Sequence, residues 1–311
     1  MDVTPEVVVV GVASRDLDPT DARGWRLGGG VSYTGLLLAR LGIRTGVLIG
    51  VDALAATAAE LDLIRDAGAD VVTVPLAHGP VLVNVERPEG RVQQCDDRSD
   101  PVPVSALPAR WRAVPAWMLV PVAAELPEAW AGIPPPHASV VVGWQGLLRR
   151  LVTDEPVHRV APRRSAIVAR ADLVGASQGD VDGGIGTADL VRLLRPGATL
   201  AFTRGASGGI ALTTGIDGSH AVARQWRTIA PARTVDPTGA GDVFLGAMAV
   251  ARLMPGLLAD ARIPDVDLLA GAAAASLALE DYGMLGVPDL DAVRARMAEA
   301  LAAGWATSAA G

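Results

Sequence analysis

Apolar and polar positions alternate along the chain in two patterns that predict strands and helices in turn. The first apolar run, residues 7–12, consists of five valines and one glycine. A continuous β-branched run of this kind is typical of a parallel strand buried on both faces. A polar, turn-rich segment at 14–27 follows, and residues 31–41 then carry apolar side chains at helical spacing up to Gly42. The same alternation continues as a strand at 45–51, a helix at 54–67 and a strand at 71–76, which predicts a doubly wound sheet.

The next segment predicts an antiparallel hairpin within this parallel pattern. Two strand-like runs, 81–86 and 91–94, flank the turn sequence Pro88-Glu89-Gly90. A hairpin inserted in a parallel α/β chain is often a lid or a dimer contact. A decorative edge hairpin is the alternative on pattern alone.

The second half of the chain returns to alternating strands and helices after a proline-rich stretch at 101–136. We expect strands at 139–143, 172–175, 200–203 and 209–213. We expect helices from Ser165 onward and at 190–194, 239–253, 268–279 and 289–303. No internal repeat or linker divides the sequence, so we expect residues 1–311 to form a single domain.

Composition and charge exclude several classes of protein. Half of the residues are hydrophobic, which is enough for a large core. The net charge of −7 argues against nucleic acid as the main partner. No apolar run approaches the ~18 residues that span a membrane. The acidic N-terminus lacks a signal-peptide pattern, so a cytoplasmic location without a membrane partner is expected.

The side chains available for chemistry are also restricted. All 27 basic residues are arginine, so a Walker A loop, a protein-kinase lysine and Schiff-base chemistry are excluded. Cys95 is the only cysteine, which excludes an intrachain disulfide. The four histidines are scattered along the chain, which disfavours a histidine-based metal site.

The most informative motif is Asp236-Pro237-Thr238-Gly239-Ala240-Gly241-Asp242, which opens an apolar helix. Small residues at a helix start let the backbone approach a ligand, and the free N–H groups there favour an anion. Asp242 falls in the first turn, where it could take a proton from an attacking hydroxyl. A glycine-rich N-cap, with Asp242 only complementing the helix dipole, is the alternative.

Two further glycine motifs precede this one. Gly28-Gly29 lies directly before the predicted helix at 31–41. A dinucleotide-binding fingerprint is disfavoured there, because it would have to follow the first strand directly. Thr203-Arg204-Gly205 ends a predicted strand and begins a glycine-rich turn.

In this order the three motifs resemble the pfkB (ribokinase-like) carbohydrate kinase family over nearly the whole chain. The resemblance implies a three-layer α/β/α core with a mostly parallel sheet and a small, reduced β lid, with lid elements near 14–27 and 78–98. It implies ATP with Mg²⁺ as the phosphoryl donor and an alcohol as the acceptor. Asp242 would be the base, and the N–H groups of Gly239, Ala240 and Gly241 would form an anion hole.

The resemblance also assigns residues around the reacting groups. For the acceptor it implies Gly28 and Gly29 together with Asp16, Tyr33 and Gln145. Ser177, Thr203 and Gly205 would contact the nucleotide, and Asp180 would hold Mg²⁺ through water. The family often binds K⁺ beside the anion hole, which here implies Asp236 and the backbone near Ala278 and Gly283. Gly30 and Tyr33 replace two ribokinase sugar contacts, which disfavours a typical ribose site.

The acceptor and the activity stay open among several hypotheses. Gln145-Gly146-Leu147-Leu148-Arg149 and Pro237 resemble the plant-type myo-inositol kinase branch, which favours a polyol such as a cyclitol. Convergence of Arg15, Arg23 and Arg26 would instead select a sugar phosphate. A nucleoside kinase and a catalytically silent nucleotide- or sugar-binding regulator are further alternatives. A homodimer formed through the lid is a further hypothesis.

Overall fold

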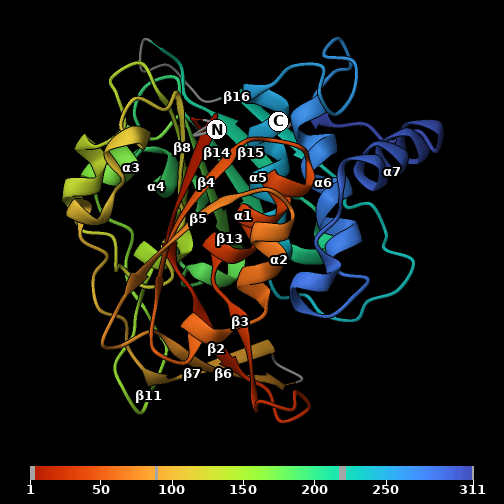
Figure 1. Ribbon diagram of the computed structural model, residues 1–311. Helices are drawn as coiled ribbons and strands as arrows, with labels where there is room; N and C mark the ends of the chain where they lie inside the picture. Colours follow the sequence, from red (N-terminus) through yellow and green to blue (C-terminus); the bar gives the residue numbers. More distant parts are fainter. Residues whose placement is uncertain (1–3, 88–89, 217–221, 310–311) are drawn as a thin grey trace.

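The computed structural model describes residues 4–87, 90–216 and 222–309, and a ten-stranded sheet forms its centre (Figure 1). Six neighbouring pairs, from β5 across to β14, are parallel, and the three pairs at the other edge are antiparallel. In spatial order the strands are β17 (Ser308–Ala309), β16 (Val222–Trp226), β15 (Gly209–Thr213), β14 (Thr199–Thr203), β13 (Leu173–Ser177), β9 (Ser139–Gly143), β8 (Ala116–Leu119), β1 (Val7–Val12), β4 (Thr45–Val51) and β5 (Asp70–Pro75).

The first strand is buried on both faces, as its valine run predicts. Val7 and Val9 belong to one hydrophobic core, and Val8 and Val10 belong to a second core on the opposite face of the sheet. Alternate side chains of a strand point to opposite faces, so β1 links the two cores. This explains why the run is continuous rather than alternating with polar residues.

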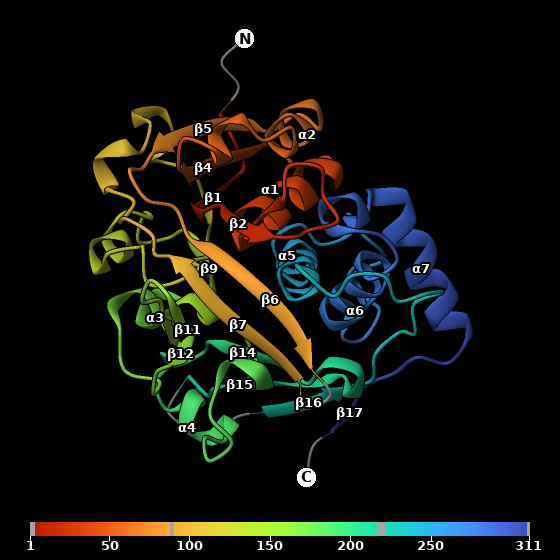
Figure 2. The same ribbon diagram turned by 90° about the horizontal axis from the view of Figure 1, so that it is seen from below.

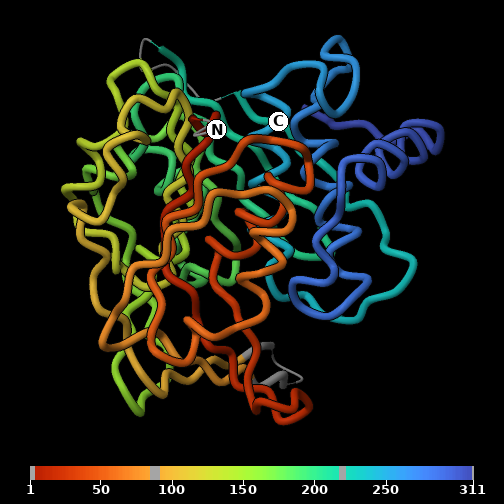
Figure 3. The backbone as a smooth tube through the Cα atoms, viewed as in Figure 1, coloured from red at the N-terminus to blue at the C-terminus, as the bar shows by residue number. Residues whose placement is uncertain are grey.

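Helices cover both faces of the sheet and make three layers, which confirms the predicted fold class (Figures 1 and 3). One face packs against the larger set: α1 (Gly30–Arg40), α2 (Glu60–Asp66), α5 (Ala240–Leu253), α6 (Val266–Ala278) and α7 (Leu290–Ala302). The other face packs against α3 (Ala166–Arg170), α4 (Thr187–Val191) and a group of buried tryptophans: Trp111, Trp117, Trp130 and Trp144.

A second, smaller sheet of five strands forms the lid, and its order is β11 (Glu155–Pro156), β7 (Gly90–Asp97), β6 (Val81–Arg87), β2 (Ser14–Leu17) and β3 (Trp25–Gly28). Figure 2 shows the β6–β7 hairpin crossing the lower side of the molecule in front of the main sheet. The predicted turn at Pro88 and Glu89 lies outside the described residues. A contact between two copies through this lid stays a prediction.

The structure differs from the sequence-based expectations in a few elements. The proline-rich stretch contains β8, a fully buried strand between β1 and β9. The helix expected at 54–67 is divided into a 3₁₀ turn, Ala55–Thr57, and α2, because Ala58 has an extended backbone. The segment at 14–27 forms the paired strands β2 and β3 rather than only turns. In the described part of the chain, no helix is long and apolar enough to cross a membrane.

Candidate active site

A cavity of about 790 Å³ lies where β9, β13 and β14 end, between the main sheet and the lid. Ligands of open α/β sheets bind outside the carboxyl ends of the strands, so this is the expected position for a site. The cavity extends from a polar end, with Asp16 from β2, past the start of α5 to an apolar end beside Trp226.

The start of α5 forms the middle of the cavity wall. Gly239 is the N-cap and has a φ of 77°, and Ala240, Gly241 and Asp242 begin the helix. A Cβ atom at Gly239 would lie 2.2 Å from the Tyr33 ring, whereas a Cβ atom at Gly241 would have no neighbour within 4 Å. Gly239 is therefore required by its backbone and its packing. Gly241 instead leaves space open in front of the helix N–H groups.

Asp242 has the electrostatics expected of a proton acceptor. Burial raises the pKa of its carboxyl to about 7, with the positive charge of Arg149 opposing the shift and the negative charge of Asp180 adding to it. A general base works best when its pKa lies near the operating pH. A strongly perturbed carboxyl in a cavity is a candidate for catalysis on physical grounds.

The glycines at 28–30 allow the start of α1 to pass between two carboxylates. A Cβ atom at Gly28 would lie 2.5 Å from Oδ2 of Asp16, and one at Gly30 would lie 2.7 Å from Oδ1 of Asp242. Gly29 has a φ of 90° and lies against the backbone of β1. The predicted glycine pair is therefore followed by a third closely packed glycine, and the run 28–30 lies between the carboxylates of Asp16 and Asp242.

Tyr33 lines the same region from α1, but it is almost completely buried, with 3% of its surface exposed. Its ring packs against Gly239, so it supports the entrance to α5 as well as lining the cavity. Burial and the neighbouring carboxylates raise the pKa of its hydroxyl well above the ordinary value, so the hydroxyl stays protonated and uncharged.

Three lining residues at the polar end were not predicted from the sequence: Asn84, Gln93 and Arg149. Nε2 of Gln93 donates to Oδ1 of Asn84 at 2.7 Å, and Nη1 of Arg149 donates to Oε1 of Gln93 at 3.1 Å. These two hydrogen bonds connect the lid strands β6 and β7 to Arg149, which lies outside the lid. One available signal was that Asn84 is the only asparagine in the chain. Arg149 is the last residue of the Gln-x-Leu-x-Arg pattern at 145–149.

Arg149 is a buried cation on the cavity wall. Its Nε donates to the carbonyl of Val122, and no carboxylate among the described residues lies within ion-pair distance of it. Burial lowers the pKa of its guanidinium, and the surrounding carboxylates oppose this shift. A buried charge is normally paired, so Arg149 is suited to an anionic group of a ligand.

Gln145, Ser177 and Asp180 form one hydrogen-bonded group at the end of β13. Oδ2 of Asp180 accepts from the Ser177 N–H at 2.7 Å and from its Oγ at 2.8 Å, and Oδ1 accepts from Nε2 of Gln145 at 3.1 Å. The described residues contain no group of three His, Cys, Asp or Glu side chains that could hold a metal. Mg²⁺ is usually held by one or two carboxylates together with waters and substrate phosphates, an arrangement that the single carboxylate of Asp180 fits.

The apolar end of the cavity lies beyond Thr203 and Gly205, which both line the cavity. Gly205 has a φ of 54°, which turns the chain at the end of β14. Most of the remaining lining residues at this end are apolar side chains from separate elements, which the sequence did not identify: Trp226, Ile229, Ala272, Ala275 and Leu279. Thr228, Thr234 and Ser276 also line the cavity. Such a slot fits a flat aromatic base.

The three arginines near the lid do not converge on the cavity. Arg15 pairs with Asp52 at 2.8 Å, and Arg23 pairs with Glu60 at 2.7 Å. Arg26 pairs with Asp18 and with Asp236, the remaining predicted site residue. None of the three lines the cavity, so they form no phosphate clamp.

No protein-family model and no curated protein sequence matches the chain. Solved structures do match it over nearly their whole length. A pyrophosphate-dependent kinase of the ribokinase family, complexed with a pyrophosphate analogue and myo-inositol, has a TM-score of 0.69 at 17% identity, covering 93% of this chain and 99% of that one. The chain has the ribokinase-like fold.

Two further structures place this ribokinase-like fold among kinases with different acceptors. Ribokinase from Arabidopsis thaliana, complexed with ribose and ATP, gives a TM-score of 0.63 at 17% identity, covering 95% of this chain and 99% of that one. The nucleoside kinase of Methanocaldococcus jannaschii gives a TM-score of 0.64 at 14% identity, covering 96% and 100% of the two chains. At such identities the similarity establishes the fold, and function has to be argued from the site.

Proposed function

We propose that this protein is a kinase that transfers the terminal phosphoryl group of ATP to a hydroxyl of a sugar or polyol. The observation that carries the proposal is the position of Asp242. Its carboxyl, with a pKa raised to about 7 mainly by burial, stands at the start of α5 in the middle of a cavity with one polar and one apolar end.

The proposed reaction uses the residues on the cavity wall. An acceptor hydroxyl oriented by Asp16 donates its proton to Asp242, and its oxygen forms a bond to the terminal phosphorus while the bond to the bridging oxygen breaks. The N–H groups of Gly239, Ala240 and Gly241 stabilise the charge on the transferring group. Mg²⁺, when bound to the phosphates near Asp180, neutralises part of their charge.

The shape of the cavity supports a nucleotide rather than pyrophosphate as the donor. Three of the matched structures are of pyrophosphate-dependent kinases. Here, however, the cavity continues past Gly241 and Thr203 into the apolar slot beside Ile229 and Leu279. Pyrophosphate would leave that slot unfilled, whereas an adenine base would bury its apolar surface there.

The polar end supports a neutral polyol as the acceptor. Asp16, Asn84 and Gln93 offer both hydrogen-bond donors and acceptors, which suits a ring with several hydroxyls such as a cyclitol. The ion pairs made by Arg15 and Arg23 weigh against a phosphorylated sugar. Arg149 favours one second candidate, an acceptor with its own carboxylate or phosphate group, since it is the buried arginine on the cavity wall.

The test is an acceptor and donor screen on the purified protein. ATP and pyrophosphate, each with Mg²⁺, are offered with myo-inositol, ribose, fructose, fructose 6-phosphate, a sugar acid and adenosine, and phosphorylated products are identified by mass spectrometry. We expect ATP-dependent phosphorylation of a neutral polyol. Turnover with pyrophosphate but not with ATP would contradict ATP as the donor. Preference for the sugar acid or for fructose 6-phosphate would support the second candidate, an acceptor with its own acidic group. Binding without turnover in any combination would favour the silent regulator.

A further inference from the structure

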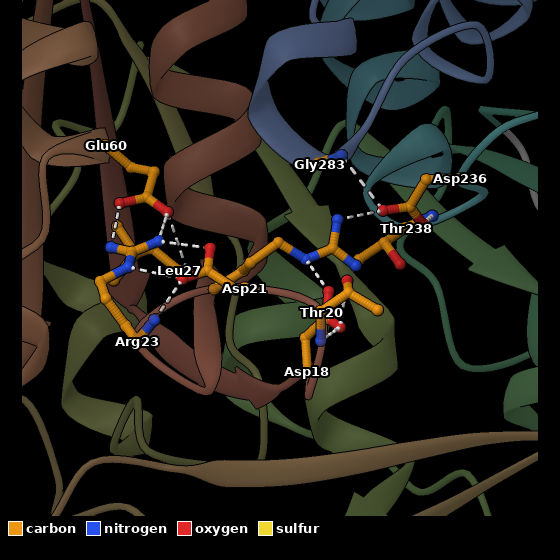
Figure 4. A network of polar contacts seen from close by, with 10 residues as sticks. Asp18, Thr20, Asp21, Arg23, Leu27, Glu60, Asp236, Thr238 and Gly283 are labelled. Atoms are coloured by element: carbon orange, nitrogen blue, oxygen red, sulfur yellow. Dashed lines mark hydrogen bonds and ion pairs between the residues drawn. The ribbon is translucent and has the colours of Figure 1, made fainter.

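The loop that leads into α5 is held by a buried carboxylate whose hydrogen-bonding positions are largely filled. Oδ1 of Asp236 accepts from the Thr238 N–H at 2.9 Å. Oδ2 accepts from Nη1 of Arg26 at 3.0 Å and from the Gly283 N–H at 3.1 Å. Figure 4 shows Thr238 and Gly283 on either side of the Asp236 carboxylate. Only 8% of the Asp236 side chain is exposed, so the charge of its carboxylate requires a partner.

The residues expected to bind K⁺ therefore do not fit a monovalent cation in this arrangement. Gly283 presents an N–H donor to the carboxylate, which repels a cation. The carbonyl oxygen of Ala278, the other expected ligand, lies only 2.4 Å from where a Cβ atom of Gly286 would stand, so the backbone of that loop packs over it. The positive charge next to Asp236 comes from the guanidinium of Arg26 instead.

Arg26 is fixed in this position from three sides. It belongs to the lid strand β3, and its Nε pairs with Asp18 of the same hairpin at 2.7 Å. Its guanidinium lies 5.6 Å from the centre of the Tyr282 ring and adjoins Gly283 in the loop after α6. A cation at Asp236 would have to displace a side chain held by two carboxylates and an aromatic ring.

We propose that Arg26 is a built-in replacement for a monovalent cation and that it positions the loop 236–239 in front of the anion hole. The proposal rests on the proposed kinase function. Asp236 and the Thr238 N–H fix the turn that places Gly239, so the charge at Asp236 controls the geometry of the helix N–H groups. It follows that the wild-type protein needs no K⁺, and that removing Arg26 creates a need for it.

The test compares Arg26→Met with Arg23→Met, a control in the same hairpin that pairs with Glu60 and does not contact Asp236. ATP turnover is measured at fixed ionic strength in K⁺ and in tetramethylammonium. We expect equal wild-type rates in both salts. We expect a fall of about 10-fold or more for Arg26→Met in tetramethylammonium, partly restored by K⁺, as is typical when catalytic geometry is lost. Arg26→Lys should keep a rate that is independent of the salt.

Melting temperature in the same two salts supplies a readout that does not need turnover. K⁺ should stabilise Arg26→Met relative to tetramethylammonium and should leave the wild type and Arg23→Met unchanged. Stimulation of the wild type by K⁺ would overturn the proposal. So would an Arg26→Met variant that behaves like Arg23→Met, or one whose loss K⁺ does not reduce. If the wild type lacks kinase activity, the proposed function fails, and the melting data alone decide the role of Arg26.

Discussion

The first residue of α1, Gly30, lies directly against the carboxylate of Asp242, since a Cβ atom on Gly30 would come within 2.7 Å of Oδ1. The two residues are distant in the sequence and start helices that pack against each other. This contact means that the position of the proposed base depends on the absence of a single methyl group.

Gly30→Ala is accordingly expected to impair catalysis more than folding. The added methyl group pushes the Asp242 carboxylate away from the acceptor, and a displacement of about 1 Å can cost ~10²-fold in rate. Steady-state kinetics should show a lower kcat with a nearly unchanged KM for ATP. Gly132→Ala is the matched control, because a Cβ atom there has no neighbour within 4 Å. Equal kcat values for the two variants would contradict the role of this contact.

Gly241→Val should separate ligand binding from stability. A Cβ atom at Gly241 would have no neighbour within 4 Å, and Gly241 has no positive φ, so the protein should fold with a nearly unchanged melting temperature. It would occupy the space in front of the α5 N–H groups, so ATP affinity and kcat should both fall. Gly239→Ala makes the useful contrast, because its positive φ and the Tyr33 ring predict a loss of stability. Normal turnover in Gly241→Val would contradict the assignment of the anion hole to the N–H groups of residues 239–241.

The pH dependence of kcat should report the base. Asp242 accepts a proton only when it is ionised, so the rate should rise as the pH increases through about 7, the value to which burial chiefly raises its pKa. Arg149→Met removes the charge that opposes this shift, so the rise should move to higher pH. Arg150→Met, an exposed neighbour on β10 (Arg149–Arg150), should leave the profile in place. A pH profile that does not move in Arg149→Met would show that the charge of Arg149 does not affect the pKa of the base.

The lid residues Asn84 and Gln93 should determine acceptor affinity. Loss of one neutral hydrogen bond costs roughly 0.5–1.5 kcal/mol, so Asn84→Ala or Gln93→Ala should raise the KM for the acceptor about 2- to 10-fold. The KM for ATP should not change, since both residues lie at the other end of the cavity. Gln94→Ala is the control, because Gln94 is exposed on the opposite face of β7. An unchanged acceptor KM in the first two variants would exclude this part of the lid from the site.

Local patterns predicted most of the fold, because the spacing of apolar residues within each strand or helix indicates which of its faces is buried. The valine run of β1 and the glycine-capped helix α1 are examples. The strand β8 was missed because four residues beside prolines carry little periodicity, although the sheet around them makes them a buried strand.

The candidate site was predictable where its chemistry is concentrated in one motif. Asp242 and its preceding glycines form a continuous segment, whereas Asn84, Gln93 and Arg149 come from three strands that only the fold brings together. The pairing of Arg26 with Asp236 joins residues 210 positions apart, and no local pattern indicates it.

The most direct test of the account is phosphoryl transfer by Asp242→Asn compared with the wild type, at saturating ATP, Mg²⁺ and the acceptor identified by the screen. Ionising a carboxyl whose pKa burial has raised from 3.8 to about 7 costs stability, so above pH 7 the neutral variant should melt no lower than the wild type. ATP should still stabilise it. The account predicts a fall in kcat of about 10²- to 10⁴-fold, the usual contribution of a general base. A folded, ATP-binding Asp242→Asn protein with wild-type turnover would contradict it.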